Sequence, residues 1–212
     1  AATCNKKGGR MFSSLGDFLD HLRSHQSLRL IDSPVDPCLE VTELSRRFLA
    51  QSGPALLFSH PKRGRFPLLT NLFADTQRVA WALGLENPQE LRSFGAQLAA
   101  LREPTPPANL QQLWRDRALY RRALGIRTQS VARPSCQEVV LAGGEIALDA
   151  LPVMTCWPED AGPLITWGAV ITRAEDSGRE NMGIYRLQVI DQQRVIVRWL
   201  EHRGGALDYR AW

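Results

Sequence analysis

The chain has 212 residues, of which 44% are hydrophobic and 23% are charged, so its composition is that of a globular protein and not of a disordered one. No apolar stretch approaches the roughly 20 residues that a membrane-spanning helix requires. The net charge of +4 is small and the arginines are scattered along the chain, which argues against nucleic acid as a partner.

The cysteines and the first residues bear on the cellular compartment. The cysteines lie at positions 4, 38, 136 and 156, without the CxxC spacing of a zinc site or the density of a disulfide-bonded domain. This pattern favours a reducing cytoplasm. The opening AATCNKKGGR lacks the apolar core of a signal peptide, so we expect residues 1–10 to form a tail outside the fold.

The first half of the chain alternates between helix and strand patterns. Helical spacing of apolar residues predicts a helix from Ser13, followed by a short strand at 28–31. A second helix, after two prolines, would turn Leu39, Val41, Leu44 and Phe48 inward. Buried strands are expected within 53–61 and 65–73, and helices at 76–85 and 88–102. These elements predict an N-terminal α/β domain over residues 11–112.

The second half is mostly strand in character. The proline-rich segment EPTPPANL, residues 103–110, prevents helix continuation and marks a domain boundary. After a helical stretch at 110–124, strands are expected at 137–143, 165–173, 183–190 and 194–200, and the GGALDY segment is expected to form a turn. The fold class is therefore α/β (α+β), with a mostly β unit over residues 113–212. We expect several of its strands to lack partners within this sequence, which favours a fragment of a longer protein.

Two of these strands each carry an arginine among apolar residues. Alternation places Ile184 and Arg186 on the face opposite Tyr185, and Arg198 on the face opposite Trp199. A tight hairpin at 191–193 would set Arg186 directly across from Arg198, whereas a shift of one residue would pair Arg186 with Trp199. The sequence leaves both registers open.

The arginine pair has two interpretations. Facing guanidinium groups repel one another unless an anion lies between them, and their planar forks fit phosphate or carboxylate. Alternatively, this face is the solvated side of an antiparallel sheet, and the pattern alone favours that second interpretation. The segment His202-Arg203-Gly204-Gly205 shifts the balance toward a site, because paired glycines permit positive φ and a close backbone approach to an anion.

Several motifs together resemble a known family. The segments MTCWPEDAGPLITWGAVITR, NMGIYRLQ and RWLEHRGGALDY are similar to the UbiD-type carboxy-lyases, in particular the polyprenyl-4-hydroxybenzoate decarboxylases of ubiquinone biosynthesis. DFLDHL, PVDPCLEVTEL, TNLFADTQRVAWALG and LREPTPP resemble the N-terminal region of that family in the same order. The resemblance runs over residues 11–212.

The resemblance implies a site for prenylated FMN and manganese, within a split β-barrel of which residues 113–212 are a part. Arg186 would be catalytic, because it matches the arginine that orients the substrate carboxylate. Asn181 would coordinate manganese at the cofactor phosphate, with His202 as a second metal ligand. The matching motifs assign cofactor contacts to Ile184, Tyr185, Arg186, Arg198, Trp199, Leu200, Arg203 and Gly204.

The resemblance also implies a reaction and its partners. The reaction is the non-oxidative decarboxylation of a small aromatic acid, 3-polyprenyl-4-hydroxybenzoate, to 2-polyprenylphenol. A flavin prenyltransferase would supply the cofactor, and the full-length protein would form a homo-oligomer in the cytoplasm, with peripheral contact to the inner membrane as an alternative. The family's glutamate metal ligand and acidic proton donor match no residue up to Trp212, since Glu159, Asp160 and Glu201 lie in other motif positions. We therefore expect this chain to be inactive by itself.

Two other functions stay open. One is a non-catalytic flavin- or phosphate-binding module built on the same split barrel, and the other is a structural fragment whose arginines are solvated. Modified flavin bound together with manganese would indicate the decarboxylase, whereas ordinary FMN without metal would indicate the binding module.

Overall fold

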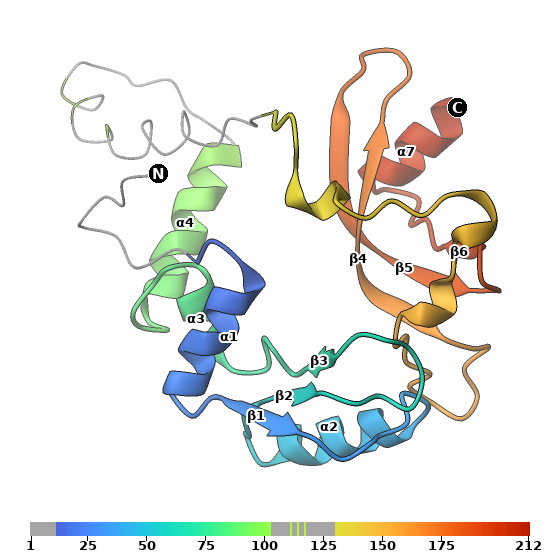
Figure 1. Cartoon of the computed structure of the whole chain (residues 1–212). Coiled ribbons are helices and arrows are strands. Elements are labelled where there is room, and N and C mark those ends of the chain that lie inside the picture. The colour runs from blue at the N-terminus through green and yellow to red at the C-terminus, as the bar shows by residue number, and fades with distance from the viewer. Residues whose placement is uncertain (1–11, 103–110, 112–113, 115–116, 118–129) are drawn as a thin grey trace. The chain divides into compact units, whose positions relative to one another are not determined.

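The computed structural model describes residues 12–102, 111, 114, 117 and 130–212. It combines helices with two three-stranded sheets, which confirms the α+β class (Figure 1). The chain divides into two compact units, one with residues up to Leu22 and Phe73–Val140, the other with Arg23–Leu72 and Leu141–Trp212. The proline-rich connector and most of the helix at 110–124 lie outside the described residues. The domain boundary at residue 112 therefore stays a prediction.

The first unit is helical, and three of its helices lie within segments that the sequence predicts to be helical. It contains most of α1 (Leu15–Ser24), then α3 (Thr76–Ala82), α4 (Glu90–Arg102) and the 3-10 helix η1 (Ser135–Gln137). Asp75 caps α3 by accepting hydrogen bonds from the Gln77 and Arg78 backbone N–H groups. His21 of α1 meets Trp81 of α3 edge-on, with the ring centroids 4.9 Å apart. Aromatic contact thus joins two helices that are far apart in the sequence.

The second unit begins with a small mixed sheet. Strands β1 (Leu28–Ile31) and β2 (Ala55–Phe58) are parallel, and β3 (Leu68–Thr70) is antiparallel to β2. Parallel neighbours need a crossover, and helix α2 (Glu40–Ala50) provides it. The buried core is formed by Val35, Val41, Leu56 and Phe58, with Ile31, Leu44, Phe48, Leu68 and Met154 packed against it.

Leu39 corrects one detail of the expected helix. It precedes α2 with a φ of 67° and is exposed, so it does not point inward with Val41 and Leu44. Its backbone N–H donates to the Thr155 carbonyl oxygen at 2.9 Å. This tertiary hydrogen bond fixes the turn that precedes the helix.

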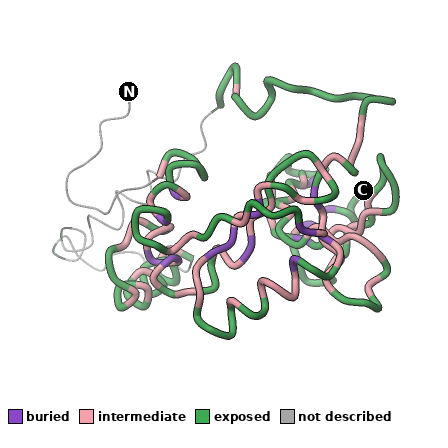
Figure 2. The backbone as a smooth tube through the Cα atoms, turned by 60° about the horizontal axis from the view of Figure 1, so that its bottom comes forward, coloured by how far each residue is buried: buried purple, intermediate pink, exposed green. Residues whose placement is uncertain are grey.

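A longer antiparallel sheet follows, in the order β4 (Leu164–Arg173), β5 (Glu180–Val189) and β6 (Val195–Val197). The 3-10 helices η2 (Gly143–Glu145) and η3 (Leu148–Ala150) precede it, and helix α7 (Gly204–Ala211) packs against β4 and β5. Figure 2 shows that buried positions form only short stretches of the chain. The strand faces expected from alternation are confirmed, because Ile184, Arg186, Ile196 and Arg198 are exposed while Tyr185, Leu187, Val197 and Trp199 are buried or half-buried.

Two expected elements are wrong. Residues 137–143 do not form a strand, because no strand of the described residues pairs with Val139 or Val140, which lie exposed between 3-10 helices. The GGALDY segment is not a turn but the first six residues of α7. Two glycines normally weaken a helix, and here packing against the sheet outweighs that preference.

Among the described residues, no helix combines the length and apolar character needed to cross a membrane.

Leu56 tests the packing of the small sheet. Replacing fully buried Leu56 with alanine leaves a cavity beside Phe58, so we expect Leu56→Ala to lower the free energy of unfolding by about 2–5 kcal/mol. Leu30→Ala on the neighbouring strand is the control, because Leu30 is 48% exposed. Urea denaturation of both variants measures the difference, and equal losses would contradict this core.

Candidate functional site

The register of the β5–β6 hairpin decides how the two arginines meet. The pairs Leu187–Val197 and Val189–Val195 fix the alignment. Beyond β6 the same alignment continues, since the Arg198 N–H donates to the Arg186 carbonyl oxygen at 3.0 Å. Arg186 and Arg198 are therefore directly opposite each other on one face of the sheet. Of the two registers that the sequence leaves open, the structure has this one.

Asp191 holds the turn that sets this register. One of its carboxylate oxygens accepts hydrogen bonds from the Gln193 and Arg194 backbone N–H groups, at 3.0 and 2.9 Å, and the other accepts from the Arg194 side chain. The Gln193 N–H first, and then the Arg194 side chain, hold the pKa of Asp191 below its ordinary value of 3.8. The charged form of Asp191 is thus favoured in the folded hairpin.

The face that carries the arginines is mainly apolar, although it is exposed. Met182 lies opposite Ile171, and Ile184 lies opposite Ala169. The exposed fractions are 74% for Met182, 67% for Ile171, 60% for Ile196 and 59% for Ile184. An ordinary solvated face would carry polar side chains at these alternating positions. We define the arginine face as Ala169, Ile171, Met182, Ile184, Arg186, Gln188, Ile196 and Arg198.

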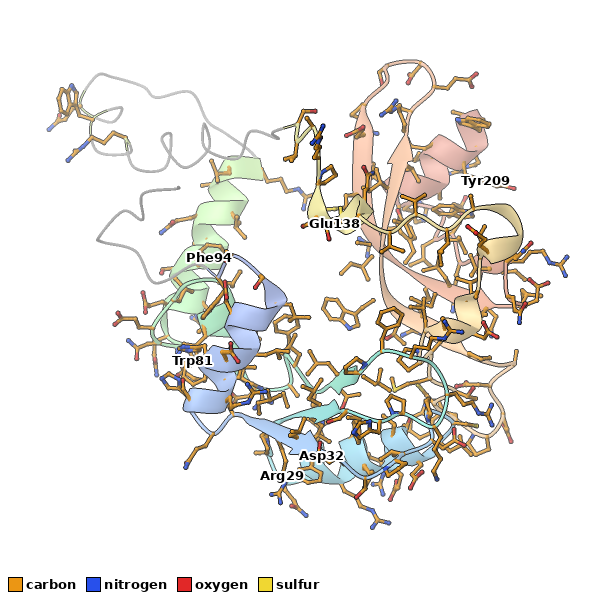
Figure 3. The ribbon with its side chains drawn as sticks, viewed as in Figure 1. Arg29, Asp32, Trp81, Phe94, Glu138 and Tyr209 are labelled. Carbon is orange, nitrogen blue, oxygen red and sulfur yellow. The ribbon has the colours of Figure 1, made fainter. Side chains whose placement is uncertain are left out.

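The opposite face of the sheet holds α7 through aromatic side chains. The Tyr185 hydroxyl accepts a hydrogen bond from the Gly205 N–H at 2.8 Å. The Trp199 ring lies edge-on to Tyr185, with centroids 5.0 Å apart, and stacks on Tyr209, which is labelled in Figure 3, at 5.9 Å. The side chains of Tyr185 and Trp199 therefore point away from the arginine face.

The two glycines of this helix are needed for close packing and not for positive φ. A Cβ atom on Gly205 would come within 2.5 Å of the Trp199 ring and 2.7 Å of the Tyr185 hydroxyl. A Cβ atom on Gly204 would overlap the Asn181 carboxamide. Neither glycine is among the positive-φ residues, so the positive φ that paired glycines permit is not used here. Their close contacts are to the side chains of Asn181, Trp199 and Tyr185, and a close approach to an anion stays a prediction.

The start of α7 has the character of an anion site. The first turn of a helix carries partial positive charge. In α7 the Gly205 N–H donates to the Tyr185 hydroxyl, and the Ala206 and Leu207 N–H groups donate to the Arg203 carbonyl oxygen, so the Gly204 N–H is the first-turn donor for which the described residues show no acceptor. Arg203 is the N-cap residue and makes no side-chain capping bond, and no acidic residue lies in the first turn. His202 and Arg203 are exposed just before Gly204. A phosphate group fits this combination.

Asn181 faces this helix start from β5. Its Nδ2 donates to the Thr172 hydroxyl at 3.1 Å, and the Thr172 hydroxyl donates to the buried Asp208 carboxylate on α7. The Asn181 Oδ1 atom is the one nearest to Gly204. Sequence reasoning missed Thr172 and Asp208, which are 36 positions apart. Alternation along β4 is the only signal for Thr172, because it sets Thr172 on the face opposite Ile171.

The predicted site residues thus fall into two groups. Ile184, Arg186 and Arg198 share the arginine face, and Leu200 is exposed just beyond β6. The start of α7 collects the other group, namely Asn181, His202, Arg203 and Gly204 with Tyr185 and Trp199. Asn181 and Arg186 are five positions apart on one strand, which corresponds to about 17 Å. Alternation also puts their side chains on opposite faces of the sheet, so a single ligand would have to pass around an edge of the sheet to reach both groups.

The residues at the start of α7 also fit a hard cation by the type of their donor atoms. An amide oxygen from Asn181 and an imidazole nitrogen from His202 are ligands that Mn²⁺ accepts, and a phosphate would add anionic oxygens. In the described part of the chain, no cluster of three His, Cys, Asp or Glu side chains could hold a metal ion. These residues would therefore supply only part of a coordination sphere.

Comparison with known proteins identifies the class to which this fold and site belong. The model of the 3-octaprenyl-4-hydroxybenzoate carboxy-lyase N-terminal domain matches residues 19–98, and the model of the Rift-related domain of the same enzyme matches residues 127–212. The two domains follow each other over most of the chain. The chain belongs to the UbiD family.

Solved structures of this class have the same fold. The UbiD-class enzyme HmfF from Pelotomaculum thermopropionicum, in complex with FMN, is 27% identical with a TM-score of 0.67 over 88% of this chain and 36% of its own. Vanillic acid decarboxylase from Sedimentibacter hydroxybenzoicus in its closed form is 22% identical, with a TM-score of 0.72 over 94% of this chain and 40% of its own. The 3,4-dihydroxybenzoic acid decarboxylase of Enterobacter cloacae is 22% identical, with a TM-score of 0.70 over 95% of this chain and 40% of its own. The chain thus spans two-fifths or less of the length of these enzymes.

Acid should weaken the β5–β6 hairpin. Because folding lowers the pKa of Asp191, its contribution to stability is fully present above about pH 4 and is lost as the pH falls through the lowered value. We expect the difference in urea midpoint between wild type and Asp191→Ala to be largest at pH 7 and to shrink below pH 4. The exposed residue Glu175 provides the control, and a Glu175→Ala variant with the same pH profile would contradict this role of Asp191.

A methyl group at Gly205 should push α7 off the sheet. Because its Cβ would overlap both Trp199 and Tyr185, we expect Gly205→Ala to destabilise the protein by about 1–3 kcal/mol. Gly144→Ala is the matched control, since nothing lies within 4 Å of the Cβ position there. Thermal unfolding and tryptophan fluorescence would measure the effect, and equal melting temperatures for the two variants would contradict the close packing of α7.

Proposed function

We propose that the protein catalyses the non-oxidative decarboxylation of 3-polyprenyl-4-hydroxybenzoate to 2-polyprenylphenol, as a step in ubiquinone biosynthesis, with prenylated FMN and Mn²⁺. Membership of the UbiD family and the likeness to FMN-bound HmfF support this proposal. The observation that carries it is the arginine face, where two directly opposed guanidinium groups lie among exposed apolar side chains. Such a surface suits a flat ring system that bears an anionic group.

The chemistry requires a cofactor. When the bond between the ring and the carboxyl carbon breaks, CO₂ leaves and an electron pair stays on the ring carbon until that carbon takes up a proton. Protein side chains have no good electron acceptor, and prenylated FMN supplies that acceptor when it is bound. The residues of this chain would bind and orient the reacting groups.

Arg186 and Arg198 would act by neutralising and orienting an anion. Among the described residues neither arginine forms an ion pair, so both guanidinium groups are available to a ligand. Arg186 would hold the substrate carboxylate, and Ile184 would provide an apolar surface for the ring. Water would be excluded from this surface by the bound ring itself, which would strengthen each charged hydrogen bond.

The start of α7 would hold the other end of the cofactor. The phosphate of FMN would accept a hydrogen bond from the Gly204 N–H, with the Arg203 charge beside it. Asn181 and His202 would bind Mn²⁺ next to this phosphate. Tyr185 and Trp199 would contribute through the backbone and by holding α7, because their side chains pack against the helix.

Several wider features belong to the same proposal. A flavin prenyltransferase would supply the cofactor, and the protein would act in the cytoplasm, with peripheral contact to the inner membrane for its polyprenylated substrate. We propose a homo-oligomer, and HmfF has been described in an evolved dimeric form with prenylated FMN.

A non-catalytic flavin-binding module is the second candidate. The described residues place no carboxylate in an ion pair with Arg186, and the acids expected for the reaction match no residue of this chain. Absorbance spectra and manganese analysis of the purified protein separate the two functions. Modified flavin with manganese, and CO₂ release from the polyprenylated acid, support the decarboxylase. Ordinary FMN without metal and without turnover supports the binding module.

The arginine pair gives the sharpest test of the site. Loss of one charged hydrogen bond costs about 1.5–3 kcal/mol, so we expect Arg186→Ala or Arg198→Ala to raise the dissociation constant of an aromatic carboxylate, 4-hydroxybenzoate, at least about tenfold. If both arginines serve one anion, the second substitution should add much less than the first. Calorimetric titration with 4-hydroxybenzoate measures these values. Arg133→Ala, which removes an exposed arginine elsewhere, is the control, and equal affinities for all variants would defeat the proposed site.

A further inference from the structure

The orientation of the Asn181 carboxamide follows from a chain of hydrogen bonds behind it. Thr172 lies directly opposite Asn181 in the β4–β5 register. The Thr172 hydroxyl donates to Asp208, and Asn181 Nδ2 donates to the same hydroxyl at 3.1 Å. Asp208 is 4% exposed, and its other carboxylate oxygen lies 3.7 Å from the Arg179 guanidinium group. This series of hydrogen bonds therefore begins at a buried carboxylate.

The donors and acceptors allow only one direction of donation along these hydrogen bonds, from Asn181 to Thr172 and from Thr172 to Asp208. A carboxylate only accepts hydrogen bonds, so Asp208 takes the single hydroxyl proton of Thr172. The Thr172 oxygen then has only lone pairs left for Asn181. An amide oxygen would repel those lone pairs, so the NH₂ end of Asn181 must face Thr172. Its carbonyl oxygen is thereby turned to the start of α7, where Gly204 leaves room for it.

We propose that Thr172 and Asp208 are positioning residues, which hold Asn181 with its Oδ1 atom toward the start of α7 so that this atom binds a cation. The inference rests on the proposed function, in which Asn181 is a ligand of Mn²⁺ at the FMN phosphate. An amide held in the other orientation would present NH₂ and would repel the cation. We call the hydrogen-bonded series Asp208–Thr172–Asn181 the relay. It determines the sign of charge that the site accepts beside the phosphate.

Two variants perturb the relay in different ways. Thr172→Val keeps the shape of the side chain but removes the hydroxyl, which leaves the Asn181 amide free to turn. Asp208→Asn is nearly isosteric, and its NH₂ group can donate to Thr172, so the Thr172 proton can pass to Asn181 Oδ1 and reverse the chain. Thr172→Ser keeps the hydroxyl and should preserve the orientation. Asp176→Asn, at an exposed aspartate of the β4–β5 turn, matches the charge change of Asp208→Asn.

The test measures Mn²⁺ affinity in the protein loaded with FMN, by electron paramagnetic resonance, and FMN affinity without metal in EDTA, by fluorescence. Thr172→Val and Asp208→Asn should raise the Mn²⁺ dissociation constant about 10- to 100-fold. Metal-free FMN affinity should change less than about twofold, and Thr172→Ser and Asp176→Asn should resemble wild type. A purely structural role would lower both affinities together and would overturn the proposal.

Asn181→Ala separates the relay from the site itself. If Asn181→Ala weakens Mn²⁺ binding but Thr172→Val and Asp208→Asn do not, the relay is refuted and the proposed function stands. If Asn181→Ala leaves Mn²⁺ binding unchanged, the metal site of the proposed function fails. Circular dichroism of each variant checks that α7 and the sheet stay folded. If Thr172→Val unfolds the protein, the near-isosteric Asp208→Asn decides the question.

Discussion

The alignment of β5 with β6 is the constraint on which the candidate site depends. Side chains alternate along a strand, so a slip of one residue would send either Arg186 or Arg198 to the opposite face of the sheet. The alignment is held by the Asp191 turn and by the backbone bond between Arg198 and Arg186. A turn of a few polar residues therefore decides whether two positive charges share a surface. The backbone geometry of this turn therefore determines which side chains face a ligand on the candidate site.

The two faces of the β4–β5–β6 sheet have different contacts. One face supports α7 through the Tyr185 hydroxyl, the Trp199 ring and the Asp208 carboxylate. The other face leaves large apolar side chains exposed around the arginine pair. Exposed apolar residues of this number are unusual on a surface that stays in water, and they mark a surface that contacts something else. The arginine face and the start of α7 therefore lie on opposite sides of the same sheet.

Much of the fold follows from the sequence, because local patterns determine it. The helices near Phe18 and Val79, and the strand faces of β5, have clear periodicity that needs no knowledge of the partner element. The strand predicted at 137–143 is wrong because Val139 and Val140 have high strand propensity, whereas a strand also requires a partner, which is a non-local property. The turn predicted at the start of α7 is also wrong, because two adjacent glycines favour a turn, and only their contacts with the sheet explain why they form a helix here. For the site, the family motifs predict the residues and alternation predicts their faces, whereas the pairing of Arg186 with Arg198 could be read only from the structure, because it depends on the register of the hairpin.

The attachment of α7 to the sheet has a thermodynamic consequence. The helix is held through Gly205 and Asp208, which lie one turn apart and bond to β5 and β4 respectively. A ligand at Asn181 and Gly204 recognises only the docked helix, so by mass action each bound molecule shifts the population toward that docked state. Ligand binding at Asn181 and Gly204 and the docking of α7 on the sheet are therefore linked in one equilibrium. The empty protein would sample undocked helix more often than the filled one, and protection of the α7 amides from solvent exchange would rise with ligand concentration.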